Sequence, residues 1–579
     1  MKNIYTLLTA VVSAMTTVIT GFSQNMAVAP GTTVTANGGM LAVKSDITND
    51  GLFLNTGNSF FFTGGSQNLK GTQPVAFEDV TIPVGTSLTT LTAGQTIVGR
   101  LLVDGTLAPG GNITLVSDAA STAWIDGSGT GEITGSMTMQ RYYSSAFGYE
   151  YISSPFQAST VAQLGDEVNL GASFPPVYRY EENRTASGWV NHSNPAGQLE
   201  IMRGYSVNLG SASQPLTADL EGIPNNGKIS LALYNNNQPY TKGFNLAGNP
   251  YPSPIDWDSE EGWTKTNIDD ALFYFIPGTT SQYSGTYSSY QNLVSSDGIA
   301  SNIIPAMQGF FVHVSNGSYP VAASLEVNNK ARTTSDSKSS SSETKALKPL
   351  VRLTAGYSDN INSFDPFVIY YDEKATTAFD GQLDALKLFN TDPAVTNFYV
   401  FANDGNKLSI NALPFTFDTL CTVRLGLKTS RSGELVFRIR DITGFYADKL
   451  ISITDAVTGE STILRTDNDF RVNLATGDYQ NRFFLNLYTI ATGTEDKTHV
   501  DEEWFKAYTY AGILKTETRL NQGREGILSI VNLNGQVMFN AVVSETGYNE
   551  FYPNLADGIY VVTMTSGTTR QSKKILFRK

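Results

Sequence analysis

The sequence predicts an all-β protein built from several domains. Its 52 glycines, 28 tyrosines and 31 phenylalanines are typical of short strands joined by tight turns. Charged residues make up only 16% of the chain, so helices with a charged solvent face are not expected. A length of 579 residues corresponds to about four domains at roughly 150 residues each.

The chain is acidic, with a formal net charge of −14, and it contains one cysteine, Cys421. A negative surface repels nucleic acid and anionic membranes, so neither is expected as a partner. One cysteine cannot form a disulfide framework, and its position far from the N-terminus excludes a lipid-anchor role. We therefore expect each domain to be stabilised by its own core.

Residues 1–24 have the pattern of a secretory signal peptide. Lys2 gives a positive start, residues 7–22 form an apolar core, and Gly21 and Ser23 are the small residues of a cleavage site. A membrane anchor is the alternative, but the stretch is short and interrupted by Thr and Ser. No other run is long enough to span a bilayer, so we expect an exported protein without a transmembrane anchor.

Residues 25–140 are polar, glycine-rich and mildly repetitive. Asx-Gly turns precede alternating strands at 49–55 and 103–109. Short, evenly spaced strands with Asn and Gly at the corners predict a β-solenoid, in which each rung buries its apolar face on the next. An antiparallel sandwich is the alternative.

Residues 141–327 contain an internal duplication. The first two matching blocks are offset by 95 residues and the last two by 105, because the second copy has an insertion around "TSQYSGTYSSYQN". The pairs are "GYEYISSPF" with "GFNLAGNPY", "VYRY" with "LFYF", "IMRGYSV" with "PAMQGFFV", and "ADLE" with "ASLE". We predict two copies of one β-rich module, at 148–222 and 243–327.

Two further segments follow the duplication. Residues 328–349 are rich in Ser and Lys and nearly free of apolar side chains, which predicts a flexible, exposed linker. Residues 350–490 return to short alternating strands and predict a β-sandwich, with one short helix at 378–389.

Residues 501–579 form a separate β unit. Two strands meet across an Asn-Gly turn within 526–543, and a second hairpin runs to the C-terminus. The chain ends on a basic strand, "SKKILFRK", although the protein as a whole is acidic. From the residues alone, these lysines protect a sheet edge against aggregation.

This arrangement resembles the C-terminal (type A) sorting domain of substrates of the bacterial type IX secretion system. The resemblance rests on the order and end-of-chain position of Gly535, Gln536, Gly558, Ile559, Tyr560, Lys573 and Lys574. It implies a small β-sandwich that is recognised by an outer-membrane translocon and usually removed on export. It also implies that the cargo passes through the periplasm of a Gram-negative bacterium and is then attached to surface lipopolysaccharide or released.

The sequence contains no recognisable catalytic motif. The three histidines, His192, His313 and His499, occur in no HExxH pattern, and no GxSxG places a serine on an elbow. Zinc catalysis and a Ser-His-Asp triad are therefore not expected, and we predict that the protein is not an enzyme. Glycoside hydrolysis needs only two carboxylates, so a hydrolase of unrecognised type is an alternative.

The densest carboxylate cluster is "PIDWDSEEGW", residues 254–263. Asp256, Asp258 and Glu260 are weak metal-ligand candidates, because a D-x-D-x-E run can present oxygens to Ca²⁺. Glu261 follows where an EF-hand loop requires glycine. The alternative is a purely structural acidic turn, and no other cofactor is expected.

Aromatic residues near this loop suggest a glycan-binding surface. Tyr283, Tyr287 and Tyr290 lie in the insertion that the first copy lacks, and Trp257 and Trp263 flank the acidic loop. Tyrosines in a Ser/Gly-rich loop offer flat amphipathic surface at little entropic cost. The alternative is that these rings only cover a hairpin.

These observations together predict an exported adhesive or structural protein of the cell surface or the medium. The expected partners are the secretion translocon and sorting machinery, and surface polysaccharide or lipopolysaccharide. A carbohydrate-binding accessory protein and a hydrolase are the alternatives, and fold class does not separate the three.

Overall fold

The computed structural model describes residues 25–333, 348–414, 421–444, 449–489 and 504–578, apart from 511, 521–524, 534, 545 and 567–568. The predicted signal peptide and most of the predicted linker lie outside these residues. The chain divides into two compact units, one of residues 1–415, 423–445 and 453–485, and one of 416–422, 446–452 and 486–579.

The structure confirms the all-β fold class. Within the described residues the helical elements are three short 3₁₀ turns, η1 (Val161–Leu164), η2 (Asn329–Ala331) and η3 (Ile361–Ser363). The helix predicted at 378–389 is wrong, because this segment forms turns and the short strand β34 (Ala385–Leu386). The Asp380 carboxylate accepts the Gln382 amide at 2.9 Å, an Asx-turn that competes with helix formation. No helix of the described residues is long and apolar enough to cross a bilayer.

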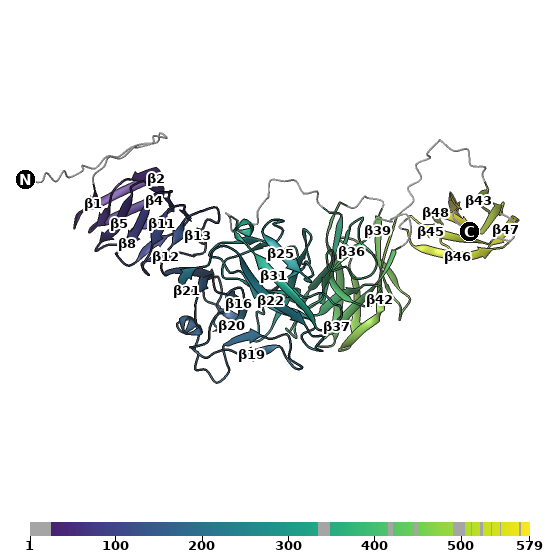
Figure 1. Cartoon of the computed structure of the whole chain (residues 1–579). Coiled ribbons are helices and arrows are strands. Elements are labelled where there is room, and N and C mark those ends of the chain that lie inside the picture. Colours follow the sequence, from purple (N-terminus) through teal and green to yellow (C-terminus); the bar gives the residue numbers. More distant parts are fainter. Residues whose placement is uncertain are drawn as a thin grey trace, which may run out of the picture. The chain divides into compact units, whose positions relative to one another are not determined.

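The N-terminal part of the first unit is a β-solenoid of three parallel sheets (Figure 1, purple and blue). The first sheet contains β1 (Met26–Val28), β3 (Ile47–Asn49), β5 (Ser66–Gly71), β8 (Ser87–Thr90), β11 (Thr106–Ala108) and β14 (Glu132–Ile133). The second contains β2 (Thr33–Val43), β4 (Leu52–Phe62), β7 (Asp79–Ile82), β10 (Arg100–Val103) and β13 (Trp124–Ile125). The third contains β6 (Ala76–Phe77), β9 (Gln95–Ile97), β12 (Ile113–Leu115) and β15 (Met137–Tyr143).

Alternating side chains of these strands point inward and stack from rung to rung. Ile47 lies beside Leu69 in register, and Leu88 beside Leu107, and all four side chains are buried. Such stacking gives each rung the apolar contact that it cannot supply alone. The last parallel strand, β15, pairs antiparallel with β21 (Leu216–Pro224), which also pairs with β17 (Phe156–Gln157) and so joins the solenoid to the following module.

The next part contains two sheets of the same strand order. In the first, β16 (Phe147–Ser153) pairs with β20 (Gly204–Ser211), which pairs with β18 (Val177–Tyr180) and then β19 (Trp189–Asn191). In the second, β23 (Phe244–Gly248) pairs with β30 (Gly309–His313), then β26 (Leu272–Pro277), β27 (Gly285–Gln291) and β28 (Val294–Ser295). The matching sequence blocks therefore lie on equivalent strands.

Two smaller sheets complete the second copy. The strand β31 (Val321–Val327) pairs with β22 (Ile229–Asn235) and β25 (Trp263–Thr266), and β24 (Ile255–Asp256) pairs with β29 (Ile303–Ile304). Their core contains Trp257, Tyr251, Phe310 and Leu325.

Most of residues 350–489 form one large sheet that folds back on itself. Its strands are β32 (Leu350–Tyr357), β33 (Asp365–Tyr371), β34, β35 (Asn397–Phe401), β36 (Lys407–Leu413), β37 (Cys421–Thr429), β38 (Gly433–Thr443), β39 (Lys449–Asp455), β40 (Ser461–Leu464), β41 (Phe470–Leu474) and β42 (Gly477–Thr489). The rings of Phe437 and Phe483, from β38 and β42, lie 4.9 Å apart in its core. Ser289 and Ser409 share a hydrogen bond of 2.7 Å that ties β27 to β36.

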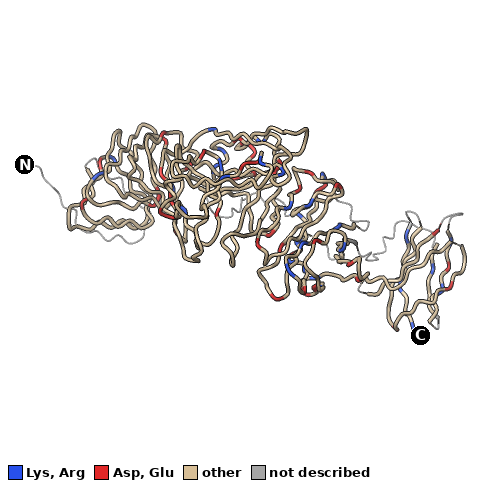
Figure 2. The backbone as a smooth tube through the Cα atoms, turned by 90° about the horizontal axis from the view of Figure 1, so that it is seen from below, with Lys and Arg blue, Asp and Glu red and all other residues tan. Residues whose placement is uncertain are grey.

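The C-terminal unit has two sheets. One contains β43 (Phe505–Tyr510), β44 (Ile513–Thr518) and β47 (Gly547–Phe551), and the other β46 (Val537–Val543), β45 (Gly526–Asn532), β48 (Gly558–Ser566) and β49 (Thr569–Phe577). Both contribute to one core that includes Phe505, Leu514, Ile530, Val562 and Phe577. Figure 2 shows acidic and basic positions interspersed along both units.

Candidate functional site

An aromatic pocket of about 290 Å³ lies between the two copies of the repeated module. Its lining residues are Tyr149, Tyr151, Phe174, Tyr178, Trp189 and Ser206 of the first copy, Phe275, Tyr283 and Tyr287 of the second, and Thr391. Cavities with predominantly aromatic walls and a few polar groups are typical of small-molecule sites. We call this cavity the aromatic pocket.

Ring packing across the two copies fixes the inner wall of the pocket. The Tyr151 ring stacks on Phe275, with centroids 5.1 Å apart and planes at 20°, and lies 5.7 Å from Trp189. The hydroxyls of Tyr151 and Tyr287 share a hydrogen bond of 3.1 Å. Because β16 and β26 carry these rings from different copies, neither copy forms the wall alone.

Two rings at the mouth of the pocket are exposed to solvent. The Phe174 and Tyr283 side chains are 52% and 55% exposed, and their ring centroids lie 5.1 Å apart. Exposed aromatic surface is unfavourable in water, and a contiguous patch of it commonly marks an interaction site. Tyr283 belongs to the insertion of the second copy, so this feature has no counterpart in the first.

Three phenol groups supply polarity. Burial raises the pKa of Tyr149 to about 12, and the neighbouring Tyr178 and Tyr283 hydroxyls add to the rise while a hydrogen bond with Asn208 opposes it. The Tyr149 hydroxyl therefore keeps its proton at neutral pH and can both donate and accept a hydrogen bond. The ten lining residues include no Asp, Glu, His, Lys or Arg.

The structure places the predicted glycan contacts in two different environments. Tyr283 and Tyr287 line the aromatic pocket. Trp257, Trp263 and Tyr290 are buried, so the prediction that they contact a glycan is wrong. Both tryptophans serve the core, because the Trp257 and Trp263 indole N–H groups donate to the Asp270 and Asp256 carbonyls at 2.9 and 2.7 Å.

Sequence reasoning missed the pocket residues of the first copy. Tyr149, Tyr151 and Tyr178 occur in the same repeat blocks that revealed the duplication, "GYEYISSPF" and "VYRY". The alternating aromatic residues in both copies could have identified them as candidates. The sequence pattern does not show, however, that strands β16 and β26 face each other.

The acidic loop at 254–263 is a turn within the described residues. Asp256 accepts hydrogen bonds from the Asp258 amide at 2.9 Å and from the Asn302 side chain at 2.6 Å, and the Asp258 carboxylate accepts one from Tyr290. Glu260 is exposed. Within the described residues, the acidic side chains whose oxygens converge are a different group, so the geometry does not support Asp256, Asp258 and Glu260 as Ca²⁺ ligands.

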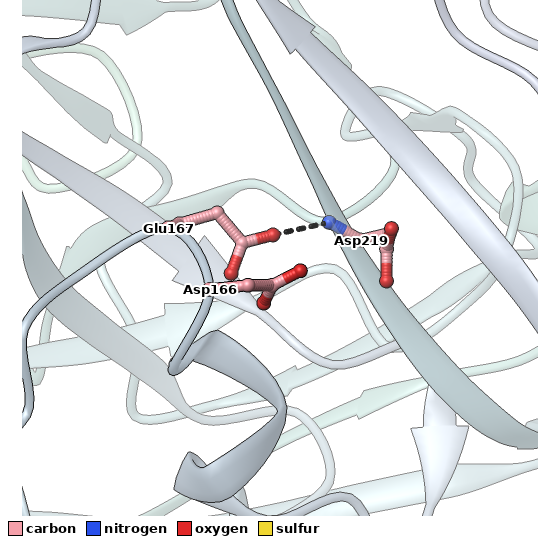
Figure 3. A group of neighbouring side chains, drawn as sticks. All are labelled: Asp166, Glu167 and Asp219. Atoms are coloured by element: carbon pink, nitrogen blue, oxygen red, sulfur yellow. Dashed lines mark hydrogen bonds between the residues drawn. The ribbon is translucent and has the colours of Figure 1, made fainter.

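That other group is Asp166, Glu167 and Asp219 (Figure 3). The Glu167 carboxyl accepts a hydrogen bond from the Asp219 amide at 3.0 Å. Burial raises the pKa of Glu167 to about 8, and a hydrogen bond with the Asp166 carboxylate adds to the rise. Burial and the negative charges of Asp166 and Glu221 also raise the pKa of Asp219. Burial and the neighbouring negative charges thus favour the protonated forms of Glu167 and Asp219.

The residues of the sorting resemblance lie on one sheet of the C-terminal unit. Gly535 has a φ of +80° in the turn between β45 and β46, where glycine is favoured, and Gln536 donates its amide to the Asn532 side chain at 3.0 Å. Gly558, Ile559 and Tyr560 begin β48. Lys573 and Lys574 lie opposite Val562 and Val561 on β49, which is an edge strand of this sheet.

The structure therefore defines a multidomain β protein with an aromatic cavity between the two copies of its repeated module. A family model described as "Domain of unknown function (DUF8693)" matches residues 63–487, and the chain belongs to this family. No curated protein matches the chain.

Three solved structures show weak similarity. A two-domain fibronectin type III segment of chicken tenascin is 12% identical, covers 25% of this chain and 93% of its own, and has a TM-score of 0.11. A β-glucuronidase from Ruminococcus gnavus is 7% identical, covers 77% of this chain and 45% of its own, with a TM-score of 0.11. The BSP domain of a biofilm associated protein is 9% identical, covers 76% and 92%, with a TM-score of 0.10. Scores this low establish neither a shared fold nor a shared function.

Proposed function

We propose that this chain is an adhesive or structural protein exported through a type IX secretion system, with residues 501–579 as its sorting domain. Its destination is the surface or surroundings of a Gram-negative bacterium, reached through the periplasm. Its partners are the outer-membrane translocon and, at the surface, polysaccharide or lipopolysaccharide.

One observation carries this proposal. The C-terminal residues have a hydrophobic core of their own, and they make up most of a compact unit that also includes the short segments 416–422 and 446–452. A sorting domain that is attached to varied cargo and removed on export has to fold independently of that cargo, and a separate core makes this possible. The resemblance of its turn and strand residues to the type A sorting domain is the reason for assigning it this role.

The final strand combines two functions on alternating positions. Ile575 and Phe577 are buried in the core, whereas Lys574 and Leu576 are exposed. Exposed lysine on an edge strand prevents pairing with other chains and also leaves a positive charge available to a receptor. Lys574 can therefore be changed without removing a core side chain.

Export can be tested with a charge reversal and a fusion. Lys574→Glu, alone and with Lys573→Glu, is expected to leave the cargo folded but retained in the periplasm. A fusion of residues 491–579 to a foreign exported protein is expected to carry it to the surface. Lys374→Glu is the control, because Lys374 is an exposed lysine outside residues 501–579. Normal surface levels of the Lys573/Lys574 double variant, or a fusion that stays in the periplasm, would contradict the proposal.

The aromatic pocket favours the carbohydrate-binding alternative over the hydrolase. Glycoside hydrolysis needs two carboxylates flanking the scissile bond, and the pocket lining contains none. An adhesive role and carbohydrate binding are compatible in one molecule.

A further inference from the structure

We propose that the aromatic pocket binds an uncharged saccharide and holds one sugar ring without cleaving it. This inference deepens the adhesive role and rests on the proposed function only for its biological setting. Binding by the purified chain is measured independently of export, so the two proposals fail in different experiments.

The pocket has the size and charge for a single neutral ring. Its volume of about 290 Å³ lies at the lower end of the range for ligand sites, roughly 300–1,000 Å³. A charged sugar would lose hydration on entering and would meet no opposite charge among the ten lining residues, which is costly. The pocket therefore selects against uronic and sialic acids.

The aromatic wall of the pocket and the tyrosine hydroxyls of Tyr149, Tyr178 and Tyr283 match the two kinds of surface on a sugar. A pyranose ring presents apolar C–H groups on its faces and hydroxyls around its edge. The half-buried rings of Trp189 and Phe275, packed against the buried Tyr151, supply apolar surface at the inner wall, and aromatic rings favour close contact with C–H groups. Hydroxyls of the sugar edge can bond to the phenols at the rim.

Polar groups of the pocket are available for a ligand. The Tyr178 and Tyr283 hydroxyls and the Trp189 indole N–H have no hydrogen-bond partner within the part of the chain that the structure describes. The Tyr149 and Tyr178 ring centroids lie 6.2 Å apart, and the Phe174 ring lies 6.2 Å from Tyr178 and 5.1 Å from Tyr283. All three tyrosines therefore line the same cavity.

The insertion makes the pocket a property of the duplicated pair. Tyr283 comes from the insertion before β27, whereas Tyr287 on β27 pairs with Phe275 as Trp189 on β19 of the first copy pairs with Tyr180. The strand β27, which follows the insertion, is held by residues of the following domain, because the Gly285 amide donates to the Thr391 hydroxyl at 3.0 Å and the Tyr287 amide to the Asn390 side chain at 3.1 Å. A preorganised wall lowers the entropic cost of binding.

The test uses the purified full chain on a panel of neutral and acidic oligosaccharides, followed by calorimetry with the best neutral ligand. We expect saturable binding of a neutral saccharide and a change in tryptophan fluorescence from Trp189. Tyr283→Ala, which removes a mostly exposed ring, should weaken binding about tenfold, and Tyr178→Phe, which removes only a hydroxyl, about three- to tenfold. Tyr240→Ala is the matched control, because Tyr240 is 71% exposed and lies outside the pocket.

Three outcomes would overturn the inference. One is that no neutral saccharide binds, and another is that acidic saccharides bind more tightly than neutral ones. The third is an unchanged Kd in the double variant Tyr178→Phe/Tyr283→Ala. Thermal unfolding of each variant distinguishes a loss of binding from a loss of folding. If Tyr283→Ala alters the loop, Tyr178→Phe still tests the inference, because it removes only a hydroxyl group.

Discussion

Met202 and Met307 occupy equivalent positions of the two copies, and each accepts a backbone hydrogen bond from the other copy. The Gly248 amide donates to the Met202 carbonyl at 3.0 Å, and the Ser153 amide donates to the Met307 carbonyl at 3.1 Å. Both methionines have positive φ, 65° and 59°, which is uncommon for a residue with a side chain. The copies therefore contact each other reciprocally, as a pseudo-twofold pair.

The two glycines that follow these methionines should tolerate no side chain. A Cβ on Gly204 would lie 2.6 Å from the Ala247 carbonyl oxygen, and one on Gly309 would lie 2.9 Å from the Tyr151 Cβ. Gly204→Ala and Gly309→Ala should each lower the free energy of unfolding by about 1–3 kcal/mol, because packed backbone must move. Urea unfolding measures this, with Gly65→Ala as control, since nothing lies within 4 Å of its Cβ position. Equal stability of all three variants would refute the reciprocal contact.

The duplicated module shows which features could be predicted from the sequence and which could not. The repeat blocks and the turn residues were sufficient for the all-β class and the solenoid, since both depend on local patterns. The left-handed backbone of Met202 could not be predicted, because methionine carries no local preference for it. The environment of Trp257 could not either, because only tertiary packing decides whether a tryptophan beside acidic residues is exposed or buried.

The candidate site was predicted only in part for the same reason. Tyr283 and Tyr287 were recognisable from composition in a Ser/Gly-rich segment. Their partners Tyr149 and Trp189 come from the other copy, roughly 95 to 140 residues earlier in the chain. Single-sequence patterns do not report such contacts.

Lys387 and Asp365 form a buried ion pair that should be costly to break. The Lys387 ammonium lies 2.6 Å from the Asp365 carboxylate, and both side chains are buried. Lys387→Met should lower the free energy of unfolding at neutral pH by about 3–5 kcal/mol, because it leaves an unpaired buried charge. Adding Asp365→Asn removes that charge and keeps an acceptor for the Phe398 amide, so the double variant should recover most of the loss. A double variant no more stable than the single one would contradict this explanation.

Three carboxyls with raised pKa, one buried and two partly buried, predict that stability decreases as pH rises. Burial raises the pKa of Glu167 to about 8 and those of Glu150 and Asp384 to about 7. Between about pH 4.5 and 8 these groups keep protons in the folded chain that the unfolded chain has lost. The free energy of unfolding therefore falls with pH, by at most about 1.4 kcal/mol per pH unit for each proton.

Glu167→Gln tests this pH dependence at one site. Glutamine resembles the protonated carboxyl, so the variant should be stabilised relative to the native chain at pH 8 and show a shallower slope from pH 4.5 to 8. Thermal unfolding across this range gives the slope. The exposed Glu260→Gln is the control, and a slope identical in both variants would show that Glu167 is ionised in the folded state.

Deletion of residues 572–579 should unfold the C-terminal unit as well as remove its charge. The deletion removes Ile575 and Phe577 from the core, where the Phe577 ring lies 6.3 Å from Tyr560. It also removes the strand that pairs with β48 from Gly558 to Thr563, so the edge of the sheet loses its hydrogen bonds. Losing one large buried aromatic side chain alone costs about 3–5 kcal/mol, a large part of the stability of a small domain. Limited proteolysis should then degrade the C-terminal unit while the first unit stays resistant, whereas Lys574→Glu should leave both resistant. A truncated chain that still yields a protected C-terminal fragment would show that β49 is dispensable to the core and that its side chains act mainly as a signal.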